Sequence, residues 1–156
     1  MPSWRGGPRA ARPTVGAANL GVAWWTIAAG MALGAVLGLW SFGGPLAPPP
    51  GFGEFDALPR RLVRLAHIAA VALPVLNLLY VPAIRASRWG PRIQRCGCRL
   101  LLLGTLGLPA LLVATAVRPR VGGLLAVPVA ALIGAVVLLA AGRPGWRPPP
   151  GEGGPP

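Results

Sequence analysis

The stretch that decides the fold is residues 100–141, LLLLGTLGLPALLVATAVRPRVGGLLAVPVAALIGAVVLLAA. It holds two apolar runs that are separated only by Arg118, Pro119 and Arg120. A helix needs about 20 residues to cross a hydrocarbon core of about 30 Å, and each run is close to that length. Because the connection is so short, the two helices must be antiparallel. The stretch therefore predicts a helical hairpin embedded in a membrane.

Two further apolar segments precede this hairpin. Transmembrane strands would show an apolar alternation over about ten residues, which is absent here. A backbone inside lipid must satisfy its own hydrogen bonds, so the segments are expected to be helices. The predicted fold class is all-α, a polytopic membrane protein with four transmembrane helices in an up-down bundle. The four predicted spans are residues 20–42, 62–84, 100–117 and 121–141.

The remaining residues define the predicted domain organisation. Residues 1–18 form a basic tail and residues 143–156 a Pro/Gly-rich tail, and both are expected to be disordered. The transmembrane domain is placed at residues 19–142. The first apolar run is longer than the 7–15 residues of a signal-peptide core, so we interpret it as a retained helix.

The composition indicates a surface that faces lipid. Hydrophobic residues make up 54% of the chain and charged residues 12%, whereas soluble domains carry about 25% charged residues. The net charge of +12 comes from arginines in the tails and at the segment ends. No basic face alternates with stacking aromatic residues, so we expect no nucleic-acid partner. The expected partner is the lipid bilayer.

The distribution of arginines predicts the orientation. Ten lie on the side of the two termini and five on the side of the first and third connections. Cytoplasmic loops carry the excess of arginine and lysine, so both termini are expected to be cytoplasmic, in the bacterial inner (plasma) membrane. We also expect two interfacial belts of aromatic residues, with Trp24, Trp25 and Tyr80 at the cytoplasmic face and Trp40 and Phe42 at the outer face.

Small residues recur at four-residue spacing in the first predicted helix, at Gly30, Gly34 and Gly38. Such rows let a second helix backbone approach closely in lipid. We predict that these glycines form a packing face, either within the chain or in a homo-oligomer or larger membrane complex. The fourth helix has a similar row, which consists of Ala126, Ala130 and Gly134.

The candidate ligand-binding residues are Arg60, Arg64 and His67, which share one broad face at the start of the second helix. The first interpretation is an anchor in which the arginines pair with lipid phosphates and with Glu54 and Asp56. The alternative is a site for an anionic substrate or a quinone headgroup. Haem is a further alternative, with His67 as an axial ligand and a partner supplying the second ligand.

Other polar residues have structural interpretations. Asn77, Thr105 and Thr115 are expected to form hydrogen bonds between helices. Cys96 and Cys98 are placed in a basic loop as reduced thiols. The prolines within the predicted spans are expected to produce static kinks, at Pro74, Pro109 and Pro128.

These observations predict a function only in outline. We identify no catalytic residue and no metal-binding residue. The three carboxylates lie outside the predicted spans, which disfavours a proton-coupled exporter. We therefore expect a non-enzymatic accessory or scaffold component without a cofactor. The alternative is a redox or small-ligand-binding module that uses Arg60, Arg64 and His67 at the outer membrane surface.

Overall fold

A computed structural model describes residues 14–41 and 43–143 of the chain. The helices in this part of the chain are α1 (Ala17–Gly38), α2 (Leu58–Arg85), α3 (Pro91–Val117), the 3-10 helix η1 (Pro119–Leu125) and α4 (Ala126–Gly142). Four segments are long and apolar enough to span a membrane: α1, α2, α3 and the combined η1–α4 segment. The predicted all-α membrane fold is therefore confirmed.

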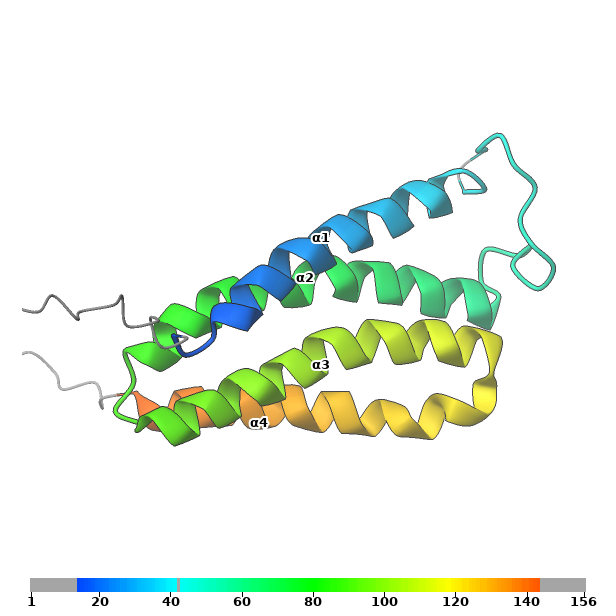
Figure 1. Cartoon of the computed structure of the whole chain (residues 1–156). Coiled ribbons are helices and arrows are strands. Elements are labelled where there is room, and N and C mark those ends of the chain that lie inside the picture. Colours follow the sequence, from blue (N-terminus) through cyan, green and yellow to red (C-terminus); the bar gives the residue numbers. More distant parts are fainter. Residues whose placement is uncertain (1–13, 42, 144–156) are drawn as a thin grey trace, which may run out of the picture.

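The four spans run up and down (Figure 1). The α1–α2 connection and η1 lie at one end of the bundle, which we call the loop end. The short α2–α3 connection and the two ends of the described chain lie at the other, the turn end. Helix α2 packs against α1 and α3, and α3 packs against α4, whereas α1 and α4 make no contact with each other. Helix α1 is therefore a peripheral helix that depends mainly on α2.

The boundaries differ from the prediction most clearly at α3. This helix begins at Pro91, nine residues before the predicted span, so the predicted basic loop is helical. Cys96 and Cys98 consequently lie in the first turns of α3, where Cys96 is exposed and Cys98 is buried. Arg92, Arg95 and Arg99 recur at helical spacing on its exposed face. The spacing of three and four residues between these arginines was the feature of the sequence that indicated a helix extending beyond the apolar segment.

The fourth span begins differently from the other three. Residues after Pro119 first form η1, and α4 starts only at Ala126. Pro128 is therefore the third residue of α4, directly after the end of η1. The predicted kink at Pro128 therefore stays a prediction, at a position just after the change from η1 to α4. Pro74 and Pro109 do lie inside α2 and α3.

Of the predicted tails, residues 1–13 and 144–156 lie outside the described residues, as does Phe42 of the predicted outer belt. The described part of the N-terminal tail is short, because α1 already begins at Ala17.

Tyr80 belongs to the core rather than to an interfacial belt. Its side chain is 1% exposed, and its hydroxyl donates a hydrogen bond of 2.9 Å to the Ala135 carbonyl of α4. The ring lies over Gly97 of α3, where an added Cβ would overlap the hydroxyl. The prediction that Tyr80 lines the membrane surface was therefore wrong, whereas Trp24 and Trp25 are 64% and 80% exposed.

The Tyr80 hydroxyl yields a testable expectation. Tyr80→Phe should lower the free energy of unfolding by about 1 kcal/mol, because one buried hydrogen bond between α2 and α4 is lost while the ring stays in place. Denaturant titration in detergent, followed by circular dichroism, would measure this. Trp24→Phe is the matched control, since it changes an exposed aromatic residue. An equal effect of the two substitutions would contradict the role of the hydroxyl.

The two rows of small residues have different surroundings. A Cβ at Gly30 would lie 3.0 Å from backbone atoms of Ala70, and one at Gly34 would overlap the His67 ring. A Cβ added at Gly38 would have no neighbouring atom within 4 Å. In α4, Ala126 and Ala130 are exposed, and the helix buries Pro128, Ala131 and Ala135 instead.

A buried polar network joins three helices near the turn end. The Asn19 amide of α1 donates to the Asn77 side-chain oxygen of α2 at 2.8 Å and to the Cys98 carbonyl of α3 at 2.9 Å. The Asn77 amide donates to the Thr105 hydroxyl at 2.6 Å. The expected interhelical role of Asn77 and Thr105 is confirmed, whereas Thr115 bonds to the Leu111 carbonyl of its own helix.

Candidate functional site

His67 lies between α1 and α2, in the half of the bundle nearest the loop end. Its Nδ1 atom is 2.8 Å from the Gly30 carbonyl oxygen, so one ring nitrogen is engaged by α1. The ring fits against Gly34, where an added Cβ would stand 2.9 Å from Nδ1. The histidine therefore holds α1 to α2, and the absence of a side chain at Gly34 makes room for it.

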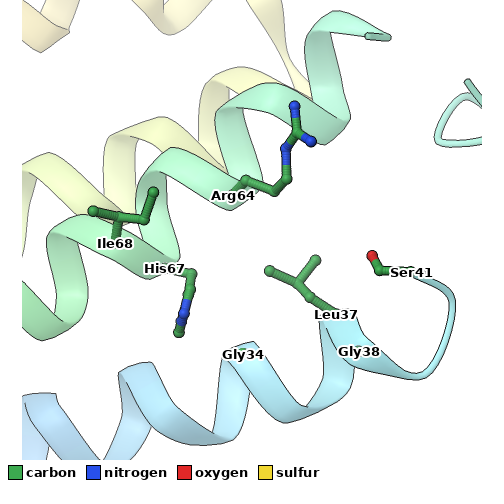
Figure 2. A pocket seen from close by; sticks show the side chains of 7 residues that line it. All are labelled: Gly34, Leu37, Gly38, Ser41, Arg64, His67 and Ile68. Atoms are coloured by element: carbon green, nitrogen blue, oxygen red, sulfur yellow. The ribbon is translucent and has the colours of Figure 1, made fainter. Parts of the chain in front are cut away.

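A groove opens beside the histidine, and we call it the His67 groove. Its volume is about 240 Å³. Figure 2 shows that His67 and Leu37 point into the space between α1 and α2, with Ser41 at the end where α1 runs into the loop. Apart from Arg64, its other walls are glycine and aliphatic. The residues that line the groove are Gly34, Leu37, Gly38, Ser41, Arg64, His67 and Ile68.

Arg60 is buried, with 6% of its surface exposed, instead of extending to the membrane surface as the sequence suggested. Its guanidinium donates to the Gly53 and Trp40 carbonyls at 3.2 and 3.4 Å and to the Ser41 hydroxyl at 3.3 Å. A further contact of 3.5 Å reaches the Phe52 carbonyl. We call this cluster of Trp40, Ser41, Phe52, Gly53 and Arg60 the Arg60 corner. It ties the α1–α2 connection to the start of α2.

The Arg60 corner leaves donors unpaired. The Nε atom of Arg60 and the Nε1 atom of Trp40 are both buried, and neither has a hydrogen-bond partner within residues 14–41 and 43–143. The acceptors that Arg60 does have are neutral and lie at the long end of the usual range of 2.7–3.2 Å, or beyond it. A buried cation without an anion is costly, and an unpaired buried donor adds to that cost. The corner therefore offers a site for an acceptor that carries negative charge.

Arg64 lies one helical turn further along α2 and is half-buried. Its guanidinium stacks on the Phe55 ring at 3.9 Å, with that of Arg60 at 5.5 Å from the same ring. Glu54 and Asp56 are exposed, and within residues 14–41 and 43–143 they form no ion pair with these arginines. The expected ion-pair network was therefore wrong, because the connection presents an aromatic ring to the arginines.

The three candidate residues are thus close along α2 but do not converge on one point. His67 and Arg64 line the groove, and Arg60 reaches it through its hydrogen bond to Ser41. In the part of the chain that the structure describes, no group of three or more His, Cys, Asp or Glu residues is placed to hold a metal ion. The arrangement combines hydrogen-bond donors, positive charge and an apolar groove.

Sequence reasoning missed the residues outside α2 that complete this region. Trp40 and Ser41 follow the end of α1, and Phe52, Gly53 and Phe55 lie in a connection whose sequence is a Pro/Gly-rich segment without a pattern. The one available signal was Phe55, an aromatic residue between two acidic residues in an otherwise Pro/Gly-rich connection. Backbone carbonyls as partners for Arg60 leave no trace in a sequence.

No protein-family model, curated protein or solved structure matches this chain.

Proposed function

We propose that the protein is a non-enzymatic membrane component, an accessory or scaffold subunit of a homo-oligomer or larger membrane complex. The observation that carries this proposal is the use of the candidate residues within the fold. His67 binds the Gly30 carbonyl, and Arg60 binds carbonyls of the α1–α2 connection. Side chains committed to such contacts support helix association rather than turnover of a substrate.

The exposed face of α1 supports the same proposal. Helix α1 packs extensively only against α2, and its other faces carry large apolar side chains such as Trp24, Trp25 and Met31. This surface contacts either lipid or another membrane helix. A subunit that associates through α1 would bury it without disturbing the three remaining helices.

The second candidate function is a redox or small-ligand-binding module that uses Arg60, Arg64 and His67. The observation in its favour is the His67 groove beside the unpaired donors of the Arg60 corner. In its redox form, this module would hold haem with His67 as an axial ligand. The groove volume of about 240 Å³ is below the range of about 300–1,000 Å³ for pockets that enclose a ligand of moderate size. Haem would therefore require α1 to move.

Mild-detergent purification of the full chain, with mass spectrometry of proteins and small molecules, tests the two candidates. The first predicts a second copy or another membrane subunit at fixed stoichiometry, without a bound chromophore. A Soret absorbance that is lost on His67→Ala would favour the second candidate and contradict the first. A monomeric protein without any partner would also contradict the first.

We further propose the bacterial inner membrane as the location, with both termini in the cytoplasm. The excess of arginine at the turn end supports this orientation.

Labelling of the two cysteines with a membrane-impermeant maleimide tests the orientation. Cys96 is exposed at the turn end, so it should stay unlabelled in intact cells and react after the membrane is opened. Cys98, which is 3% exposed, should react much more slowly in both conditions. The single-cysteine variants Cys98→Ser and Cys96→Ser separate the two thiols. Rapid labelling of Cys96 from outside intact cells would reverse the proposed orientation.

A further inference from the structure

We propose that the Arg60 corner and the His67 groove together bind one phosphate-bearing amphiphile, a phospholipid whose phosphate lies at the corner and whose acyl chain lies in the groove. This inference rests on the second candidate function, namely that the region is a binding site, and it adds the chemical class of the ligand. A bound lipid is equally compatible with a scaffold, because the site holds the ligand and does not transform it.

The charges at the loop end require an anion. Arg60 is buried, and its hydrogen-bond acceptors among the described residues are all neutral oxygens. Arg64 adds a second guanidinium within reach of the same aromatic ring. Both stand in the first two turns of α2, where the helix dipole is also positive. Phosphate oxygens are strong partners for arginine, since they accept charge-assisted and bidentate hydrogen bonds.

The unpaired donors indicate where the anion binds. Arg60 Nε belongs to α2 and Trp40 Nε1 to the segment just after α1, and neither atom has a hydrogen-bond partner in the part of the chain that the structure describes. The Ser41 hydroxyl accepts from Arg60 and also lines the groove. A phosphate beside Ser41 would therefore lie next to both guanidinium-bearing residues and next to the opening of the groove.

The shape and lining of the groove indicate the rest of the ligand. Gly34, Leu37, Gly38 and Ile68 give it an apolar wall, and it continues from Ser41 toward His67 (Figure 2). Gly38 leaves open space next to α1, because no atom lies within 4 Å of its absent Cβ. The groove lies between α1 and α2, which are both long and apolar enough to span a membrane. An acyl chain fits this position, whereas a free phosphate ion would leave the groove unfilled.

Native mass spectrometry of the full chain in delipidating detergent tests the proposal. The probes are phosphatidylglycerol, diacylglycerol with the same acyl chains, and inorganic phosphate. We expect phosphatidylglycerol to bind and diacylglycerol to bind far more weakly. Inorganic phosphate should compete poorly, because it lacks the chain.

Four variants separate the two parts of the site. Arg64→Gln should weaken phosphatidylglycerol binding by about tenfold or more, since it removes a charged hydrogen-bond donor. Gly38→Leu should weaken it by filling the groove while the guanidiniums stay in place. Arg120→Gln, an exposed arginine at the same end, and Gly21→Leu, an open glycine of α1, are the matched controls and should bind as the wild type. Helical content and melting temperature confirm that each variant is folded.

Each result has a defined meaning. Equal binding of phosphatidylglycerol and diacylglycerol would overturn the proposal, as would equal effects of the site and control variants. A simple anion site would be indicated if phosphatidylglycerol binding were lost in Arg64→Gln but kept in Gly38→Leu, and if inorganic phosphate competed effectively. This result would overturn the phospholipid proposal. Retention of a different small molecule, lost on His67→Ala, would overturn the lipid but keep the second candidate function. If no ligand bound at all, both the phospholipid proposal and the second candidate function would be overturned.

Discussion

Gly30→Leu is expected to weaken the docking of α1 on α2 more than any other single change in α1. A Cβ at this position meets the Ala70 backbone at 3.0 Å, and a backbone cannot move aside as a side chain can. Overfilling a packed contact costs about 1–3 kcal/mol. The substitution also pushes away the Gly30 carbonyl that binds His67. We therefore expect the free energy of unfolding to decrease by an amount near the upper end of this range, about 3 kcal/mol.

Unfolding by sodium dodecyl sulfate in mixed micelles, followed by circular dichroism and tryptophan fluorescence, would measure this loss. Gly21→Leu is the control, since it adds the same side chain to the same helix where no atom lies within 4 Å. The comparison removes the general effect of leucine on helix propensity and detergent binding. If both variants were equally stable, the close approach of α1 and α2 at Gly30 would be wrong.

The second large effect is expected for Asn77→Leu. Asn77 accepts from Asn19 and donates to Thr105, so its removal breaks hydrogen bonds to α1 and to α3 at once. Each interhelical hydrogen bond in a membrane contributes about 1 kcal/mol, so we expect a loss of about 2 kcal/mol. Leucine has the same branching and number of side-chain heavy atoms as asparagine and is somewhat larger, so the substitution leaves no cavity.

The same micelle titration measures the change, and a double-mutant cycle with Asn19→Leu identifies its source. The two substitutions should be non-additive, because both remove the bond between Asn19 and Asn77. Thr115→Val is the control, since its hydroxyl bonds only within α3. Additive effects of Asn19→Leu and Asn77→Leu would show that the two side chains do not interact.

The sequence predicted the fold well where the signal was length and apolarity. Four spans, the α3–α4 hairpin and the interhelical role of Asn77 follow from residues that must avoid unsatisfied polar groups in lipid. It failed where a helix continues beyond the apolar core, as at Pro91, because hydropathy does not report helices that extend into water. It also failed at Tyr80, since an aromatic residue near a span end reads as interfacial whether it points inward or outward.

The candidate site could be predicted only in part. The proximity of Arg60, Arg64 and His67 follows from helical spacing along α2, and this holds in the structure. The partners do not follow, because Gly30, Trp40, Phe52 and Gly53 act through backbone carbonyls that any residue supplies. The stacking of Arg64 on Phe55 depends on the path of a connection that has no periodic pattern.

The peripheral position of α1 has a consequence for biogenesis. During synthesis α1 is translated before α2, which supplies nearly all its contacts. It must therefore persist for a time without its main packing partner. Residues 17–41 contain no ionisable side chain, so this waiting state carries little electrostatic cost. The hydrogen bonds from Asn19 to Asn77 and to the Cys98 carbonyl can form only after α2 and the start of α3 have been made, so α1 is fixed in place after the helices that follow it.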